Sequence, residues 1–260
     1  MCVKRQLISC GHYGIGIVSI FYFSFRELFA SSHVVSKVIL LAIQKQVQRI
    51  AREGLIALTV VALLTGLLVV LQVSEIASSI EDEKLLETIV VMFLLRELAP
   101  LLVAFLVAGQ ASVIISMDIW SLRVGMQLQS LEAMGIRPMG FVVLPRMIAV
   151  LVVMIGSVGY FTLLAVIASM ISATLVLEIS FEVFIDTLLI VTNLSDFGVM
   201  FMKSVIFGLI VAGVCCHHGF LVRDARDGVL YASVLAILSS VVICVLLDGF
   251  VNGILTVVSL

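Results

Sequence analysis

Five long apolar runs constrain the fold of this chain more than any other feature. They cover about residues 54–74, 86–110, 140–171, 196–216 and 231–257. A run of about 20 mostly apolar residues is long enough to cross the hydrocarbon core of a bilayer as one helix. The composition agrees, because only 12% of the residues are charged, against about 25% in soluble domains. The sequence therefore predicts an all-α integral membrane protein with five transmembrane helices.

The remaining segments are too short or too polar to span. Residues 12–30 carry glycines and aromatic residues and are expected to lie along the membrane interface, and the basic segment 44–53 is expected to be helical there. In segment 178–192, Glu178, Glu182 and Asp186 recur every fourth residue and make one helix face acidic. This segment is expected to be a re-entrant or interfacial helix. We predict one domain over residues 1–260, with interfacial or elbow helices in 1–53 and a five-span bundle in 54–257.

The distribution of Lys and Arg predicts the orientation. With a cytoplasmic N-terminus, 12 of the 15 basic residues fall in cytoplasmic segments, one falls outside and two fall within spans. Acidic clusters at 81–83 and 178–186 fall on the outer side. Five spans then place the C-terminus on the periplasmic side.

Four charged residues lie inside the predicted spans: Arg96, Glu97, Lys203 and Asp248. Each charge at the centre of a membrane costs at least about 2.5–3.5 kcal/mol, so these residues are expected to meet partners or water. Arg96 and Glu97 are neighbours that point about 100° apart on a helix and are expected to reach different helices. We expect Arg96 to pair with Asp248 and Glu97 with Lys203, and the swapped pairing remains open.

Pro100 adds a second polar feature to the same stretch. It has no N–H, so the carbonyl of Arg96 loses its helical partner and the helix is expected to kink. A freed carbonyl at membrane depth is tolerated only where protein or a water-filled cavity covers it. The stretch predicts a polar cavity between the second, fourth and fifth spans. The alternative is a charge-paired clamp that only holds the bundle together.

These residues resemble a known family. The segments LLRELAP (94–100), LLVAFLVAG (101–109), LEAMGIRP (131–138), VLPR (143–146) and KSVIFG (203–208), with Leu247-Asp248, are similar to the MlaE (YrbE) family of ABC-transporter permeases. The resemblance has similar spacing over essentially the whole chain. It implies the membrane subunit of a Mla/Mce phospholipid transport system in the bacterial inner membrane. The family's intramembrane charged residues correspond to Arg96, Glu97, Lys203 and Asp248.

The resemblance also implies partners. It implies a homodimer whose halves enclose a cavity for phospholipid, a cytoplasmic ABC ATPase (MlaF-like), a periplasmic MCE-domain protein (MlaD-like) and a small STAS-domain protein (MlaB-like). The chain contains no GxxxxGK[ST] motif, so ATP and Mg are expected in the partner ATPase, and this chain is expected to be no enzyme. No cofactor, metal or nucleic acid is expected here. The sequence Cys215-Cys216-His217-His218 is a poor metal site because adjacent helical residues diverge.

The segment 116–137 is predicted to couple the permease to its ATPase, and it departs from the family pattern. Gln110, Ser112, Asp118, Trp120 and Met126 replace the residues typical of the family at these positions. The polar residues that remain available for contact with the ATPase are Asp118, Arg123, Gln127 and Glu132. The alternative is an ordinary amphipathic helix with a solvated face.

The residues expected to line the lipid cavity, beside the four charges, are Leu71, Gln72, Leu98 and Pro100. Two other functions are consistent with the residues alone. In a charge- or proton-coupled secondary transporter, Glu97 or Asp248 would carry the proton. A non-transporting scaffold of an envelope complex would fit the divergent coupling segment.

Overall fold

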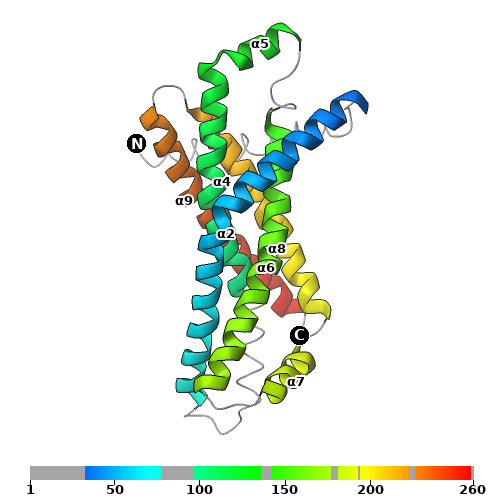
Figure 1. The fold of residues 1–260 in the computed structure, drawn as a ribbon, viewed down its shortest axis with the longest axis vertical. Coiled ribbons are helices and arrows are strands. Elements are labelled where there is room, and N and C mark those ends of the chain that lie inside the picture. Colours follow the sequence, from blue (N-terminus) through cyan, green and yellow to red (C-terminus); the bar gives the residue numbers. More distant parts are fainter. Residues whose placement is uncertain are drawn as a thin grey trace. The chain divides into compact units, whose positions relative to one another are not determined.

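The computed structural model describes residues 33–77, 97–135, 142–176, 181–192, 194–222 and 226–258. Within these ranges every regular element is helical (Figure 1). The helices are α2 (His33–Ala77), α4 (Ala99–Val124), α5 (Gln127–Ala133), α6 (Leu144–Val176), α7 (Phe181–Val191), α8 (Leu194–Leu221) and α9 (Arg226–Val258). The predicted all-α fold class is confirmed for the described part of the chain.

Five of these helices are long and apolar enough to cross a membrane. The candidate spans are Leu40–Gln72, Ala99–Val124, Leu144–Val176, Ser195–Leu221 and Gly228–Gly253. Each overlaps most of the described part of one predicted apolar run, so the prediction of five spans is confirmed. The interfacial segment predicted at 12–30 lies outside the described residues.

Helix α2 is a single helix of 45 residues. The basic segment 44–53, predicted to be helical, continues into the first span without a break. No proline occurs between His33 and Ala77, and eight of the ten residues 44–53 are glutamine, lysine, arginine, alanine or glutamate, which favour helices. Nothing in the local sequence therefore ends the helix where the polar segment meets the apolar one.

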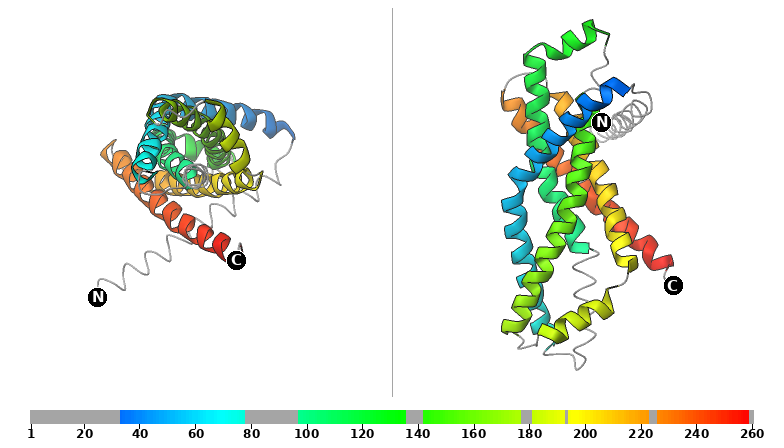
Figure 2. Two further views of the ribbon diagram at one scale, coloured as in Figure 1. Left: turned by 90° about the horizontal axis from the view of Figure 1, so that it is seen from below. Right: turned by 45° about the vertical axis from the view of Figure 1, so that its right-hand side comes forward.

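Helix α4 extends beyond the predicted boundary at residue 110 and ends at Val124. Ser112 and Ser116 are fully buried, so the polar residues after Gly109 face the interior and do not mark the end of the helix. The helix ends at a turn in which Met126 has a φ of 56°. The carbonyl of Met126 then accepts the first hydrogen bond of α5, from the N–H of Ser130 at 3.0 Å. Figure 1 and the right-hand view of Figure 2 show α5 as a separate short helix beyond the end of α4.

Pro100 is the second residue of α4. A proline inside a helix removes one backbone hydrogen bond, because it has no N–H. Glu97 and Leu98, immediately before α4, form a π-helical turn. Such turns accompany an interrupted hydrogen-bond ladder. The carbonyl of Arg96, which was expected to lose its partner, lies outside the described residues.

The segment 178–192, predicted as a short re-entrant or interfacial helix, contains α7, which has 11 residues. This helix is too short to cross a bilayer. Glu182 and Asp186 are both exposed, and Glu178 lies outside the described residues. The location of α7 at a membrane surface remains a prediction.

The chain divides into two compact units. The first contains residues 1–50, 107–153 and 209–243, and the second contains 51–106, 154–208 and 244–260. Each of the five long helices contributes residues to both units. The charged residues that were predicted inside the membrane belong to the second unit, and the predicted coupling segment belongs to the first.

Close helix contacts hold each unit together. In the second unit, a Cβ added to Gly66 of α2 would lie 2.4 Å from the carbonyl oxygen of Ala165 on α6. In the first unit, a Cβ added to Gly219 of α8 would lie 2.7 Å from Cδ1 of Ile119 on α4. Small residues allow helices to approach closely in a membrane, where the hydrophobic effect does not drive helices together. Glycine is therefore required where α2 crosses α6, whereas at Gly219 the terminal methyl group of Ile119 could move to admit a Cβ.

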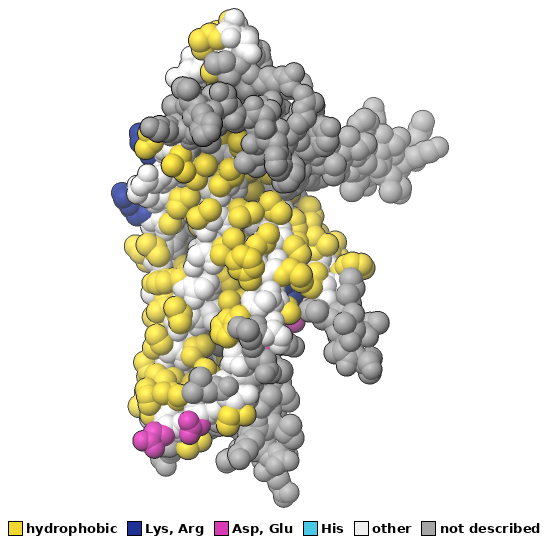
Figure 3. Space-filling model, turned by 90° about the vertical axis from the view of Figure 1, so that its right-hand side faces the viewer, with side chains coloured by type: hydrophobic (Ala, Val, Ile, Leu, Met, Phe, Trp, Pro, Cys, Tyr) yellow, Lys and Arg dark blue, Asp and Glu magenta, His cyan; other side chains and the backbone are white. Residues whose placement is uncertain are grey.

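Large apolar side chains also cover the outer surface. Leu64, Leu163, Leu175 and Leu246 are among those that are more than half exposed. Figure 3 shows that hydrophobic side chains occupy most of the described surface on one face of the molecule. Soluble proteins rarely expose such continuous apolar surface. The surface supports the assignment of a multi-pass membrane protein.

Candidate functional site

A buried lysine organises the charged site of the second unit. Lys203 of α8 has no exposed side-chain surface, and its Nζ lies 2.8 Å from Oδ1 of Asp248 on α9. The same Nζ lies 3.4 Å from Oε1 of Glu97, in the turn before α4. One ammonium group therefore contacts two carboxylates that come from different parts of the chain. Such a buried charge is tolerated because it is paired and hydrogen-bonded.

Asn252 completes this cluster. The Nζ of Lys203 donates to Oδ1 of Asn252 at 2.6 Å. The amide nitrogen of Asn252 donates to Oε2 of Glu97 at 2.5 Å and to Oδ2 of Asp248 at 3.2 Å. The amide thus accepts from the cation and donates to both anions, which also defines the orientation of its oxygen and nitrogen. We refer to Glu97, Lys203, Asp248 and Asn252 as the charge cluster.

The members of the charge cluster differ in their exposure. The side chain of Asp248 is 8% exposed and that of Glu97 is 29% exposed. The shortest ionic contact therefore joins the two most buried groups, and the longer one reaches the more accessible carboxylate. Among the three charged members, Glu97 is the one that solvent or a ligand can approach in this conformation.

The predicted pairing of Glu97 with Lys203 is confirmed. Lys203 also pairs with Asp248, a contact that belongs to the swapped pairing left open by the sequence. Because Arg96 lies outside the described residues, its pairing with Asp248 stays a prediction. Asn252 was missed, although its spacing of four residues from Asp248 places both on one face of a helix.

The residues predicted to line a lipid cavity have different environments. Leu71 and Gln72, near the end of α2, are exposed, while Leu98 is half-buried and Pro100 is buried. The exposed pair is accessible to a ligand or to lipid, whereas Pro100 packs inside the second unit. Their role in lining a cavity stays a prediction.

Two of the predicted coupling residues make internal contacts in the first unit. Asp118 of α4 accepts hydrogen bonds from Nη1 of Arg49 at 2.8 Å and from Nε2 of Gln46 at 3.2 Å. Arg123 donates to the carbonyl of Val222 and, at 3.2 Å, to that of Phe220. These two side chains stabilise the packing of helices within the unit.

The other two coupling residues belong to α5. Gln127, its first residue, is exposed and accessible to a partner. Glu132 lies on the same helix, and its side chain is outside the part of the structure that is described. A contact between this helix and an ATPase stays a prediction.

The part of the chain that the structure describes contains no group of three or more His, Cys, Asp or Glu residues arranged to hold a metal ion. The side chains of Cys215, Cys216 and Cys244 are buried. The charge cluster is an ion-pair network, which suits a structural or gating role inside a membrane.

Five helices long enough to span a membrane, together with this buried ion-pair network, define a polytopic membrane protein of the transport type. Residues 43–254 match the family described as Permease MlaE, and the chain belongs to this family. Membership indicates an ABC permease, which is a transport subunit and not an enzyme, and it implies an ATPase partner.

Relatives of this chain are described as probable ABC transporter permease proteins. A probable ABC transporter permease protein of Rickettsia typhi is 24% identical over 241 residues, which cover 93% of this chain and 92% of that protein. One from Synechocystis is 26% identical over 159 residues, or 61% of this chain and 60% of that protein. One from the red alga Porphyra purpurea is 27% identical over 145 residues, or 55% of each chain.

Proposed function

We propose that this chain is the permease subunit of an ATP-driven complex that moves phospholipids between the bacterial inner membrane and a periplasmic MCE-domain protein. The observation that carries the proposal is the buried charge cluster in a chain that belongs to the permease MlaE family. The chain would act as a homodimer with a cytoplasmic ABC ATPase, which binds ATP and Mg, and with a small STAS-domain protein. Its N-terminus would be cytoplasmic and its C-terminus periplasmic, as the distribution of Lys and Arg predicts.

The charge cluster would act as a clamp or gate in the transport cycle. Lys203 offers no surface to a lipid headgroup in this conformation, because Asp248, Asn252 and Glu97 surround its Nζ. Breaking a buried ion pair costs about 3–5 kcal/mol, which is within the free energy that a partner ATPase can supply. A phosphate headgroup would compete with Glu97, whose contact with Lys203 is the longer of the two ion pairs. This geometry supports a clamp in the resting state and headgroup contact only after Glu97 moves away.

ATP hydrolysis in the partner would reach the permease through α5 and the end of α4. The exposed Gln127 is the described residue of the predicted coupling segment that best suits direct contact. Asp118 and Arg123 would transmit the movement, since they join α4 to α2 and to the end of α8.

Co-purification and transport together test the proposal. The chain is purified from native membranes in lipid nanodiscs, its partners are identified, and transfer of labelled phospholipid to the MCE protein is measured. An ABC ATPase and an MCE protein should co-purify, and transfer should require ATP. The matched control replaces the Walker lysine of the ATPase, which should abolish transfer without changing assembly.

Two other outcomes define the alternatives. If neither partner co-purifies and transport follows a proton gradient alone, the chain is a secondary transporter in which the buried Asp248 or Glu97 carries the proton. If both partners assemble but no lipid moves, the chain is a scaffold of an envelope complex. Either outcome contradicts the proposal.

A further inference from the structure

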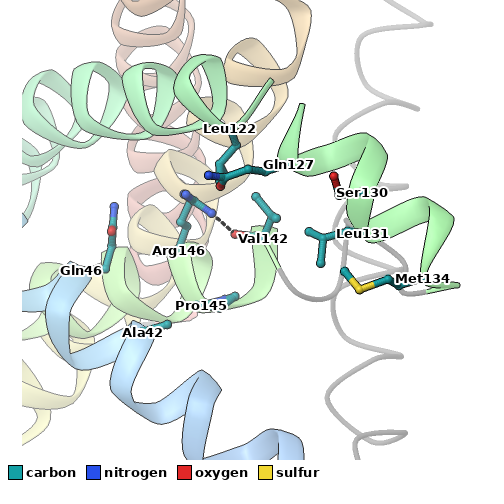
Figure 4. A pocket seen from close by; sticks show the side chains of 10 residues that line it. All are labelled: Ala42, Gln46, Leu122, Gln127, Ser130, Leu131, Met134, Val142, Pro145 and Arg146. Carbon is teal, nitrogen blue, oxygen red and sulfur yellow. Dashed lines mark hydrogen bonds between the residues drawn. The ribbon is translucent and has the colours of Figure 1, made fainter. Parts of the chain in front are cut away.

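A cavity of about 420 Å³ lies within the first unit, and none of the residues of the charge cluster lines it. Its lining comes from α2, the end of α4, α5 and the start of α6 (Figure 4). The volume falls within the range of about 300–1,000 Å³ that is typical of small-molecule sites. All of its lining residues belong to one compact unit.

The cavity lies at the ends of three candidate membrane spans. Ala42 is close to the start of the span Leu40–Gln72, and Pro145 is close to the start of Leu144–Val176. Leu122 is close to the end of Ala99–Val124. Two of these spans have 33 residues, more than the about 20 that cross the hydrocarbon core, so their ends reach the lipid headgroups. A ligand in this cavity therefore meets the polar boundary of one leaflet.

The lining combines apolar walls with one cation. Arg146 is the charged member, and Gln46, Gln127 and Ser130 supply uncharged polar groups. The apolar walls are formed by Ala42, Leu122, Leu131, Met134, Val142 and Pro145. Figure 4 shows Arg146 on α6 between the α2 residues and the residues of α5. This combination suits an amphiphile with an anionic head.

The guanidinium of Arg146 retains hydrogen-bonding capacity. Its Nη1 donates to the carbonyl of Val142, and its Nη2 lies 3.7 Å from Asp118. Its buried Nε has no hydrogen-bond partner among the described residues. Asp118 is closer to Arg49, at 2.8 Å, so it neutralises Arg146 only in part. A small rotation of the guanidinium would let Nε and Nη2 bind one phosphate in a bidentate manner.

We propose that this cavity binds an anionic phospholipid from the surrounding leaflet, with its phosphate at Arg146 and its glycerol and first acyl carbons against the apolar walls. The apolar walls and the position at the span ends favour a lipid over free phosphate as the source of the anion. The site shares no residue with the charge cluster or with the residues predicted to line the transport cavity, and the inference does not rest on the proposed function. The lipid would join α5 to α2 and α6 through contacts with Gln127, Leu131 and Gln46.

Binding of short-chain phospholipids to the full chain in neutral detergent tests the proposal. Native mass spectrometry compares phosphatidylglycerol with phosphatidylcholine of the same acyl length. The full chain should bind phosphatidylglycerol about tenfold more tightly, as about 1.4 kcal/mol of additional interaction would produce. Arg146→Gln should remove this preference. Arg52→Gln should retain it, because Arg52 is exposed on α2 and does not line the cavity.

A second variant tests the cavity even if Arg146→Gln does not fold. Ser130→Trp fills the cavity from α5 and retains the cation, and because Ser130 is exposed the replacement leaves the core intact. It should weaken phosphatidylglycerol binding about tenfold as well. Equal binding of the two lipids, or unchanged binding in Ser130→Trp, would overturn the proposal. Inorganic phosphate that displaces the lipid completely at millimolar concentration would also overturn it and indicate a free-anion site.

Discussion

Lys203 and Asp248 form the most buried ion pair of the described chain, with Nζ and Oδ1 2.8 Å apart and side chains that are 0% and 8% exposed. The pair joins α8 to α9, and Glu97 and Asn252 connect it to the start of α4. Contacts with one ammonium group therefore hold together three segments that are distant in sequence. The stability of the second unit should respond strongly to changes at these four positions.

Replacing Lys203 with methionine should destabilise the protein by about 3–5 kcal/mol, because it leaves Asp248 and Glu97 without their cation. Thermal unfolding of the purified protein in detergent measures the loss. Lys45→Met is the matched control, since Lys45 is exposed on α2. Equal midpoints for the two variants would show that the ion pairs contribute nothing to stability.

The double variant Lys203→Met with Asp248→Leu should be more stable than Lys203→Met alone. The second change removes the carboxylate that burial penalises most, and the remaining Glu97 is 29% exposed and can be hydrated. The same unfolding measurement checks the recovery. A double variant that is less stable than both single variants would contradict this account.

Asn252→Leu should cost about 1–3 kcal/mol, because it removes donors to two carboxylates and an acceptor for Lys203. Asn252→Asp should reduce the free energy of unfolding by more than Asn252→Leu, although aspartate is closer to asparagine in shape. The reason is that three carboxylates would then lie around one ammonium group. Unfolding midpoints rank the two variants. If Asn252→Asp were as stable as the unmodified protein, the amide could not be the donor that joins Glu97 to Asp248.

Gly66→Ala should destabilise the second unit by about 1–3 kcal/mol, because the added methyl group would lie 2.4 Å from the carbonyl oxygen of Ala165. Gly156→Ala is the control in the same unit, since a Cβ there meets no atom within 4 Å. The measurement is again thermal unfolding. Similar midpoints for the two variants would mean that α2 and α6 can separate without cost.

Arg123→Met should destabilise the first unit by about 1.5–3 kcal/mol, because it removes charged hydrogen bonds to the carbonyls of Phe220 and Val222 at the end of α8. Gln127→Ala should leave stability unchanged, as Gln127 is exposed. In the complex, Gln127→Ala should instead weaken binding of the ATPase to the permease, measured without added lipid. If Gln127→Ala changed only stability, the prediction that it contacts the ATPase would be wrong.

Several features of the fold could be predicted because they depend on local composition. Apolar runs of about 20 residues predicted the five candidate spans, since the cost of placing polar groups in hydrocarbon does not depend on which helices are neighbours. The end of α4 could not be predicted from this pattern. Ser112 and Ser116 look like a polar boundary, but both side chains are buried inside the first unit.

The candidate site, like the fold, could be predicted from the sequence only in part. Charges inside an apolar chain need partners, and this could be inferred from the sequence alone. It predicted the contact between Glu97 and Lys203. The tertiary structure was needed to show that Lys203 contacts two carboxylates and that the amide of Asn252 donates hydrogen bonds to both of them. The physical reason is that insertion cost is a property of each residue, whereas a hydrogen-bond partner depends on which helix faces are brought within 3 Å of each other by packing.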